Sequence, residues 1–209
     1  MARNIFPQCK QCRREGEKLF LKGERCYTSK CAMVKRNFPP GAHGNKSRSK
    51  ITGYGIQLRE KQKAKRIYGI LEKQFRNYFL KASRQAGNNI ENFARLLETR
   101  LDNVIYRAGF AASRKLARQL VSHGHLQVND RRCDVPSYHV KTGDKIVPKA
   151  QALKNKYFQE LGKALEKHGS PSWIELDKKN YIITIKALPR LVDAQQNLTL
   201  QLVVEFYSR

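Results

Sequence analysis

The second half of the chain is organised around one stretch, which reads Ser113-Arg114-Lys115-Leu116-Ala117-Arg118-Gln119-Leu120-Val121-Ser122-His123-Gly124-His125. Ser113 is a plausible N-cap and Gly124 a plausible C-terminal stop, so the stretch predicts a short helix. Its leucines share one face, which we expect to pack on a core, whereas Arg114 and Arg118 lie one turn apart on another face. Two guanidinium groups at this spacing are suited to neighbouring phosphates.

Short strands are predicted after this helix, at 126–128, 131–132, 138–140, 145–147, 173–176 and 181–185. Asn129 and Asp130 tolerate a positive φ, so they suit the tight turn of a hairpin between the first two strands. Leucine and tyrosine recur every four residues between 153 and 165, which predicts a helix. The second half is therefore expected to be α+β with a small antiparallel sheet.

Apolar residues three and four apart predict helices in the first half, at 56–68, at 71–87, and from 88 to 109. Gly69 ends the first of these helices, and Asn88 or Asn89 can cap the third. At the other end of the chain, residues 198–206 fit a strand and a helix equally well.

The net charge points to a polyanionic partner. The 209 residues include 42 Lys or Arg and 17 Asp or Glu, which gives a formal charge of +25, and residues 1–100 hold 24 of these bases and 7 of these acids. Such self-repulsion disfavours an isolated compact state and predicts nucleic acid as the partner. An anionic membrane surface is the main alternative partner, but the termini show neither a basic amphipathic helix with a bulky apolar face nor a lipidation signal.

Other classes are excluded by composition. Hydrophobic residues at 40% rule out a wholly disordered basic tail. No run approaches the roughly 18 apolar residues of a membrane span. The opening residues lack the apolar centre of a signal peptide, so we expect the protein to remain in the reducing compartment where it is made.

Four cysteines near the N-terminus are spaced as metal ligands: Cys9, Cys12, Cys26 and Cys31 read C-x2-C-x13-C-x4-C. Residues 1–45 contain too few large apolar groups to fold alone, so a metal would supply the folding energy. The spacing favours one structural zinc ion, with a four-iron iron–sulfur cluster as the open alternative. Two disulfides are disfavoured because the compartment is reducing. A redox CxxC pair is disfavoured because a second pair of cysteines is present.

Basic residues surround the cysteines and continue along the chain. Residues 37–50 are rich in Pro, Gly and Ser, so this connector is expected to be irregular and free to follow a phosphate chain. The next predicted helix carries Arg59, Lys61, Lys63, Lys65 and Arg66. Glu60 is the one acid within that helix, so internal ion pairs explain few of the bases, and a helix facing RNA is favoured over a solvated one.

Several runs together resemble a known family. Arg100-Leu101-Asp102-Asn103-Val104, the stretch 113–121 and His123-Gly124-His125 resemble the S-four RNA-binding domain. Further runs resemble the bacterial small-subunit ribosomal protein four family: Arg13-Arg14-Glu15-Gly16, Pro40-Gly41, Leu58-Arg59-Glu60-Lys61-Gln62-Lys63, Arg66-Ile67-Tyr68-Gly69, Gln74-Phe75-Arg76-Asn77 and Glu205-Phe206-Tyr207-Ser208-Arg209. The likeness covers nearly the whole chain, and the four cysteines match the metal-binding branch of the family.

The resemblance implies a function and several partners. It implies direct, primary binding to small-subunit (16S-type) rRNA, early assembly of the subunit, and a place in the cytoplasm within that subunit. It also implies contacts with ribosomal proteins three and five and with messenger RNA where the messenger enters the subunit, and a share in translational accuracy. The resemblance further implies that residues 198–206 form a helix that returns to the first domain.

The predicted fold is α+β, with an α-helical rRNA-binding domain at 1–98 that contains the four-Cys metal module at 1–45. An S-four RNA-binding domain follows at 99–190, and residues 191–209 pack back on the first domain. The predicted RNA-binding residues are Arg3, Arg13, Arg14, Lys22, Arg25, Lys35, Arg36, His43, Lys46, Arg48, Lys50, Arg59, Lys61, Lys63, Arg66, Arg76, Arg114, Lys115, Arg118 and His123.

No enzymatic activity, membrane or small-molecule substrate is expected. An RNA modification enzyme with an S-four domain is disfavoured, because about 100 residues beyond the motif contain no domain of catalytic size. An RNA-binding regulator of transcription or translation that uses the same surface remains the alternative function.

Overall fold

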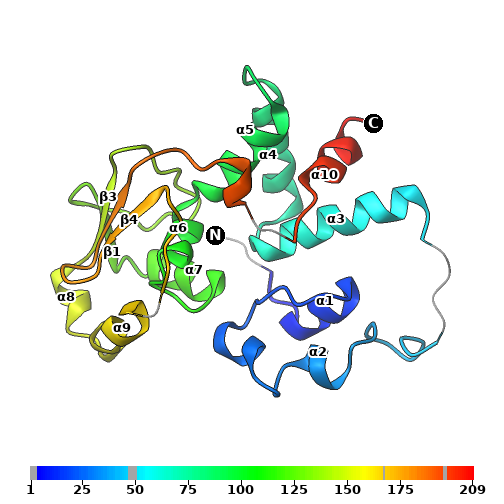
Figure 1. The fold of residues 1–209 in the computed structure, drawn as a ribbon, viewed down its shortest axis with the longest axis horizontal. Coiled ribbons are helices and arrows are strands. Elements are labelled where there is room, and N and C mark those ends of the chain that lie inside the picture. Colours follow the sequence, from blue (N-terminus) through cyan, green and yellow to red (C-terminus); the bar gives the residue numbers. More distant parts are fainter. Residues whose placement is uncertain (1–3, 47–50, 167, 195–196) are drawn as a thin grey trace. The chain divides into compact units, whose positions relative to one another are not determined.

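The computed structural model describes residues 4–46, 51–166, 168–194 and 197–209. The chain divides into two compact units, Met1–Phe93 with Gln195–Arg209, and Ala94–Ala194. In the sequence colouring of Figure 1, the first unit begins in blue and ends in red, and the second unit runs from green to orange. The boundary falls inside α5 (Asn89–Glu98), upstream of the boundary expected after residue 98. Within the described ranges, no helix is long and apolar enough to cross a membrane.

The first unit is helical, and its elements are α1 (Gln8–Glu15), η1 (Gly23–Tyr27), α2 (Ala32–Lys35), α3 (Gly53–Ile67), α4 (Glu72–Ser83), the start of α5, and α10 (Leu200–Tyr207). Thr52 caps α3, because its Oγ1 accepts a hydrogen bond from Gly55 N at 3.2 Å. At the other end, Gly69 adopts a left-handed φ of +64°, which ends the helix as predicted.

Aromatic rings form the core of this unit. Phe93 meets Phe75 and Phe79 edge-on, with ring centroids 5.2 and 6.2 Å apart, and Tyr207 of α10 stacks on Phe79 at 5.0 Å. Figure 1 shows α10 lying beside α3, against which it packs. Residues 198–206, whose sequence fits a strand and a helix equally well, therefore belong to a helix from Leu200 onward. Helical spacing is what brings Tyr207 onto this aromatic core.

One helix was expected from 88 to 109, and this expectation is wrong. Asn88 does cap α5, and its Oδ1 accepts from Ile90 N at 2.9 Å. The helix stops at Glu98, however, and α6 (Leu101–Arg107) begins after Arg100, which is extended with φ −64° and ψ 136°. The backbone of Arg100 instead bridges to His139, so the predicted strand at 138–140 contributes one isolated bridge and no regular strand.

The second unit holds a five-stranded antiparallel sheet in the order β2-β1-β3-β5-β4. Its strands are β1 (Leu126–Val128), β2 (Arg131–Arg132), β3 (Lys145–Pro148), β4 (Ile174–Asp177) and β5 (Ile182–Ile185). Val128 pairs with Arg131 across a two-residue turn, in which Asn129 and Asp130 adopt φ of 49° and 62°. Two consecutive positive φ values define a type I′ turn, which confirms the predicted hairpin.

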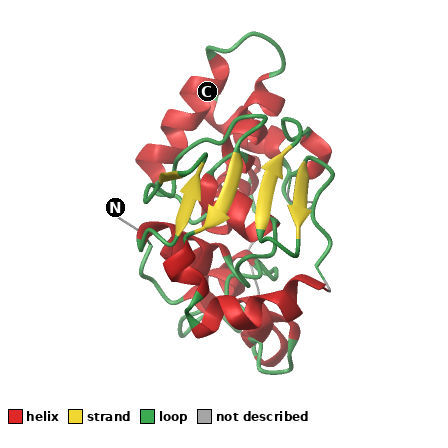
Figure 2. Cartoon of the chain, turned by 90° about the vertical axis from the view of Figure 1, so that its left-hand side faces the viewer, coloured by secondary structure: helices red, strands yellow, loops and turns green. Residues whose placement is uncertain are grey.

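The helices of this unit are the end of α5, α6, α7 (Arg114–Ser122), α8 (Ala150–Leu153) and α9 (Lys156–Glu166), with a short η2 (Leu191–Asp193). Figure 2 views the sheet face-on, with helices lying behind it. Ser113 caps α7 as predicted, because its Oγ accepts from Leu116 N at 3.3 Å. Leu120 of α7 is buried in the same core as Ile146 and Trp173. The helix expected across 153–165 is interrupted and forms α8 and α9.

Glu72 links α10 to the rest of the first unit. Its carboxylate accepts hydrogen bonds from Lys61 Nζ at 2.8 Å, Lys65 Nζ at 2.9 Å and the Tyr207 hydroxyl at 2.7 Å. Partial burial opposes ionisation of the carboxyl, but these three donors outweigh it and lower the pKa of Glu72 to about 2. The folded state therefore favours the ionised form of Glu72.

We expect Glu72→Gln to lower the free energy of unfolding at neutral pH by about 1 kcal/mol, a modest loss because a half-exposed ion pair is screened by solvent. The stabilisation is fully present above the ordinary glutamate pKa and is lost as pH falls towards 2, because protonated Glu72 loses its charge. Denaturant unfolding between about pH 6 and pH 2 measures this. The free energy of unfolding of the variant should fall less steeply with decreasing pH than that of wild type.

Glu160→Gln is the matched control, since Glu160 is exposed and lies 3.9 Å from its helix neighbour Lys156. If the free energy of unfolding fell equally steeply with decreasing pH in wild type and Glu72→Gln, the assigned role of Glu72 would be contradicted.

Candidate nucleic-acid interface

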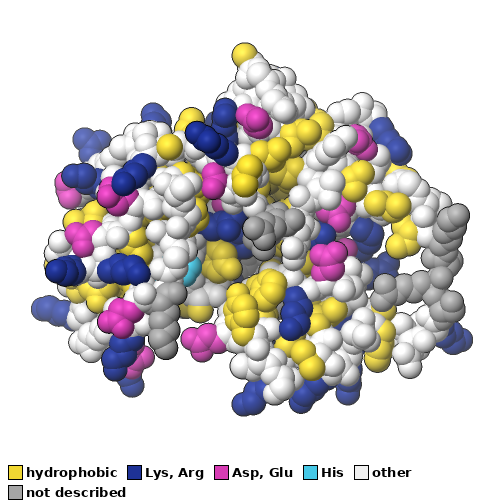
Figure 3. Space-filling view, in the orientation of Figure 1, with side chains coloured by type: hydrophobic (Ala, Val, Ile, Leu, Met, Phe, Trp, Pro, Cys, Tyr) yellow, Lys and Arg dark blue, Asp and Glu magenta, His cyan; other side chains and the backbone are white. Residues whose placement is uncertain are grey.

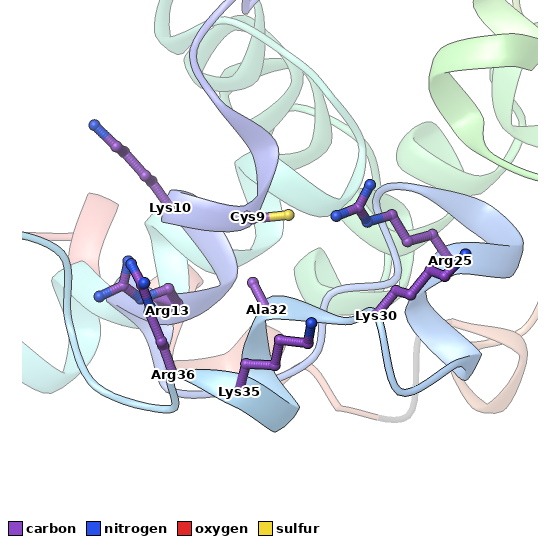
Figure 4. Close-up of a pocket in the computed structure, with 8 residues that line it drawn as sticks. All are labelled: Cys9, Lys10, Arg13, Arg25, Lys30, Ala32, Lys35 and Arg36. Atoms are coloured by element: carbon purple, nitrogen blue, oxygen red, sulfur yellow. The ribbon is translucent and has the colours of Figure 1, made fainter.

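A basic hollow of about 510 Å³ lies between α1, η1 and α2. Figure 4 shows the side chains around it: Cys9, Lys10, Arg13, Arg25, Lys30, Ala32, Lys35 and Arg36. Lys10 and all four basic residues from η1 to Arg36 are exposed. In Figure 3, Lys and Arg side chains gather along the lower edge of the molecule, over α1 and α2. A concave surface with several positive charges is suited to the phosphates of a nucleic acid.

Arg13 differs from the other bases of the hollow, because it braces the connector. Its Nε donates to Phe38 O at 2.9 Å and its Nη2 to Pro39 O at 3.3 Å. The guanidinium also lies 5.0 Å from the centroid of the Phe38 ring. Arg13 thus fixes where the connector leaves the cysteine segment, and its contact with RNA stays a prediction.

Several other predicted RNA-binding residues are exposed, namely Arg14, Lys22, His43, Lys46, Arg76, Lys115 and His123. Arg3, Arg48 and Lys50 fall outside the described residues. Exposure makes each of the seven available to a partner without disrupting a buried interaction.

The four cysteines occupy neighbouring elements of the first unit. Cys9 and Cys12 lie on α1, Cys26 lies in η1, and Cys31 precedes α2. Burial raises the pKa of the Cys12 thiol, and the other three cysteines raise it further, so the four lie close enough to interact electrostatically. Over the described ranges, however, no three His, Cys, Asp or Glu side chains are arranged to hold a metal ion. The donor set has the number and kind of ligands that zinc prefers, whereas its placement does not form a coordination site.

The basic residues of α3 do not form an open RNA-facing surface. Lys61 and Lys63 are buried, with side chains 8% exposed. The Lys63 ammonium lies 2.9 Å from Glu17 Oε2 and 3.1 Å from Glu60 Oε1. Burial alone would lower the pKa of Lys63, but hydrogen bonds to these two carboxylates raise it.

Arg59 and Arg66 of α3 share one buried acid. Both guanidinium groups pair with Glu15 of α1, whose side chain is 2% exposed. The prediction counted acids within α3 alone and therefore missed partners supplied by α1, α4 and the segment after α1. In this structure the bases of α3 hold the cysteine segment and α10 in place, and any contact they make with RNA stays a prediction.

The guanidinium groups of Arg114 and Arg118 on α7 are held by side chains of α6, and their contact with RNA stays a prediction. Arg114 Nε donates to Asn103 Oδ1 at 2.8 Å, and its guanidinium lies 4.4 Å from the Tyr106 ring centroid. Arg118 Nη1 lies 3.5 Å from Asp102 Oδ2, and the Arg118 side chain is 12% exposed. The physical reason is that α6 buries polar side chains that need hydrogen-bond partners, and α7 supplies them.

Basic residues that sequence reasoning missed lie near the C-terminal end of α7. Arg131 and Arg132 of β2 are exposed, and Lys149 is half-buried after β3. Two consecutive arginines directly after a tight turn are the available signal, because a hairpin return places them at the surface. The sequence pattern alone assigns them to a strand and says nothing of a ligand.

Comparison with known proteins agrees with these features. Residues 3–98 match the ribosomal protein S4/S9 N-terminal domain, and residues 99–146 match the S4 domain. The chain belongs to the ribosomal protein S4 family. This is an rRNA-binding family, so the resemblance seen in the sequence motifs is confirmed at the family level.

Curated relatives in this family are similar over the whole chain. The chain is 52% identical over 209 residues to the small ribosomal subunit protein uS4 of Geobacter metallireducens and to that of Natranaerobius thermophilus. It is equally similar to the small ribosomal subunit protein uS4A of Alkaliphilus metalliredigens. In each case the match covers 100% of both chains.

We expect Arg114→Ala/Arg118→Ala to lower the free energy of unfolding by about 2 kcal/mol or more, because each substitution removes a charged hydrogen bond from a part-buried site. Lys115→Ala on the same helix is the matched control and should change stability by less than about 0.5 kcal/mol, since Lys115 is exposed. Denaturant unfolding measures both. Equal midpoints for the double variant and wild type would show that α7 does not depend on these contacts.

Proposed function

We propose that this protein is a structural component of the small ribosomal subunit that binds the rRNA of that subunit directly. The observation that carries the proposal is the basic hollow of Figure 4, in which bases from three consecutive elements line one concave surface. Membership of an rRNA-binding family supplies the class of nucleic acid. The family is structural and not enzymatic, and the protein acts in the cytoplasm as part of the subunit.

The exposed bases bind by neutralising phosphates. Lysine and arginine release counterions from the nucleic acid when they approach its backbone, which makes affinity strong and salt-dependent. Arg13 holds the start of the connector, at Phe38 and Pro39, against α1, which carries part of the basic hollow. Shape and charge, with few base contacts, are the expected basis for recognising a folded rRNA junction.

Finer parts of the function follow from the family resemblance. They are primary binding early in subunit assembly, contacts with ribosomal proteins three and five and with messenger RNA where it enters the subunit, and a share in translational accuracy. These roles require a protein that stays bound, which the proposed phosphate contacts would provide.

A structural zinc ion held by the four cysteines is part of the same proposal. Cys9, Cys12, Cys26 and Cys31 would hold it as thiolates, and a site closed by four protein ligands would leave no position for water. When bound, the ion would supply folding energy to the segment that carries the basic hollow. The chemistry of the donor set and the electrostatic influence of the other three cysteines on Cys12 support this, with an iron–sulfur cluster as the alternative.

Binding through the hollow predicts a selective decrease in affinity. Lys30→Ala/Lys35→Ala should weaken binding to a small-subunit rRNA fragment about tenfold or more and reduce the salt slope by about 0.9 for each phosphate that is no longer neutralised. Lys163→Ala/Lys179→Ala removes the same charge from exposed positions outside the hollow and should have a small effect. Both are measured at several salt concentrations, and equal decreases for the two pairs would contradict a localised site.

Sedimentation separates the ribosomal role from the alternative, an RNA-binding regulator. A structural component should remain with small subunits after a high-salt wash, whereas a regulator that binds free RNA should be released.

The metal proposal predicts about one zinc ion for each chain by elemental analysis of the purified protein. Cys26→Ser should lose the metal and the ordered structure of residues 1–45, with the sheet-bearing unit intact by circular dichroism. Metal-free native protein with four freely titratable thiols would contradict the proposal.

A further inference from the structure

A second basic hollow lies in the sheet-bearing unit, at the C-terminal end of α7. It has a volume of about 380 Å³, and its lining includes His123, His125, Arg132, Lys149, Gln151 and Asn155. These residues come from the end of α7, from β2, and from the segment that joins β3 to α8 and α9. Three separate parts of the unit therefore bring their polar groups to one concave surface.

The backbone brings these groups together through two close contacts. Gly124 ends α7 with φ of +67°, and a Cβ at this position would lie 2.9 Å from Arg132 Nε. Glycine thus permits both the turn and the close approach of the guanidinium group. On the other side, Lys149 N donates to His125 O at 2.8 Å, which fixes the residue before α8 beside the backbone of His125.

The charges of the hollow depend on two imidazoles. The rings of His123 and His125 lie 5.9 Å apart, and the His125 ring meets Phe158 of α9 edge-on at 6.2 Å. Burial lowers the pKa of His125, and the neighbouring His123 and Lys149 lower it further. Arg132 and Lys149 bring further positive charge to the same hollow.

Arg132 is held by a surface ion pair. Its Nη2 lies 3.7 Å from Asp134 Oδ2, and both side chains are more than half exposed. Such a surface ion pair contributes little, so exchanging it for a phosphate costs little. A phosphate near Arg132 and Lys149 would lie beside both imidazoles, and its negative charge would favour their protonated forms.

We propose that this hollow holds a backbone phosphate of the bound RNA, and that His123 and His125 take up protons as the phosphate binds. This inference rests on the proposed rRNA binding and adds to it a dependence on pH. A phosphodiester keeps its single charge near neutrality, so the imidazoles are the groups that titrate. Because the bound state holds more protons, affinity rises as pH falls, by up to tenfold per pH unit for each proton that is fully linked.

The test compares affinities of the full chain for one rRNA fragment at about pH 6 and about pH 8, in the same salt, where histidine changes its charge. Wild type should bind about fivefold or more tightly at the lower pH, within the tenfold-per-unit limit for one linked proton. His123→Gln/His125→Gln should lose most of this ratio of affinities between the two pH values, whereas Lys163→Ala/Lys179→Ala should keep it. Because the RNA is the same throughout, its own titration cancels in the comparison.

His123→Arg provides a second variant at an exposed position, so folding is not at risk. Its permanent charge should raise affinity at the higher pH and reduce the ratio. Calorimetric titration in two buffers of different ionisation enthalpy should show proton uptake by wild type that the glutamine variant loses.

Two outcomes would overturn the inference while leaving rRNA binding intact. One is tight binding by wild type with no dependence on pH, and the other is a glutamine variant that keeps the wild-type ratio and proton uptake. Absence of rRNA binding by wild type at both pH values would instead overturn the proposed function itself, and this inference with it.

Discussion

A buried ion pair determines how the second unit is built. Arg100 is fully buried, and its Nε and Nη2 donate to the carboxylate of Asp102 at 3.0 and 2.6 Å. A guanidinium in the interior that lost its carboxylate would cost about 3–5 kcal/mol, so packings that separate the two are excluded. To keep them together, the chain leaves the helical path between α5 and α6. The extended backbone at Arg100 then bridges to His139, and the loop before β3 is joined to the helices.

The same pair determines which face of α7 is open. Asn103, next to Asp102, donates to buried Glu98, which also accepts two hydrogen bonds from Arg107. Arg114 and Arg118 of α7 complete this polar network from the other side. Because these arginines face α6, the surface that α7 offers to a partner is made by other residues. That surface includes Lys115 along the helix and the basic hollow at its C-terminal end, where β2 and the α8 segment add their own charges.

Local signals in the sequence predicted local structure well. The caps at Ser113 and Asn88, the glycine stop after α3 and the hairpin turn at 129–130 each depend on a few neighbouring residues, and all were predicted. The break at Arg100 was not predictable in this way, because the apolar pattern continues across it and the cause is a buried ion pair completed by tertiary contacts. The ion pairs of the α3 bases were missed for a similar reason, since Glu15 and Glu72 lie on other helices and meet α3 only in the folded unit.

The pairing on α3 also explains why the positive potential concentrates elsewhere in the first unit. Ion pairs do not change the net charge, but they decide where opposite charges meet. Four of the acids in this unit, Glu15, Glu17, Glu60 and Glu72, lie against the bases of α3. The segment from η1 to the end of α2 carries Glu24 as its single acid beside several exposed bases. Folding therefore uses the acids to attach the cysteine segment and α10 to α3, and it leaves the basic hollow with few neighbouring acids to weaken its attraction for phosphate.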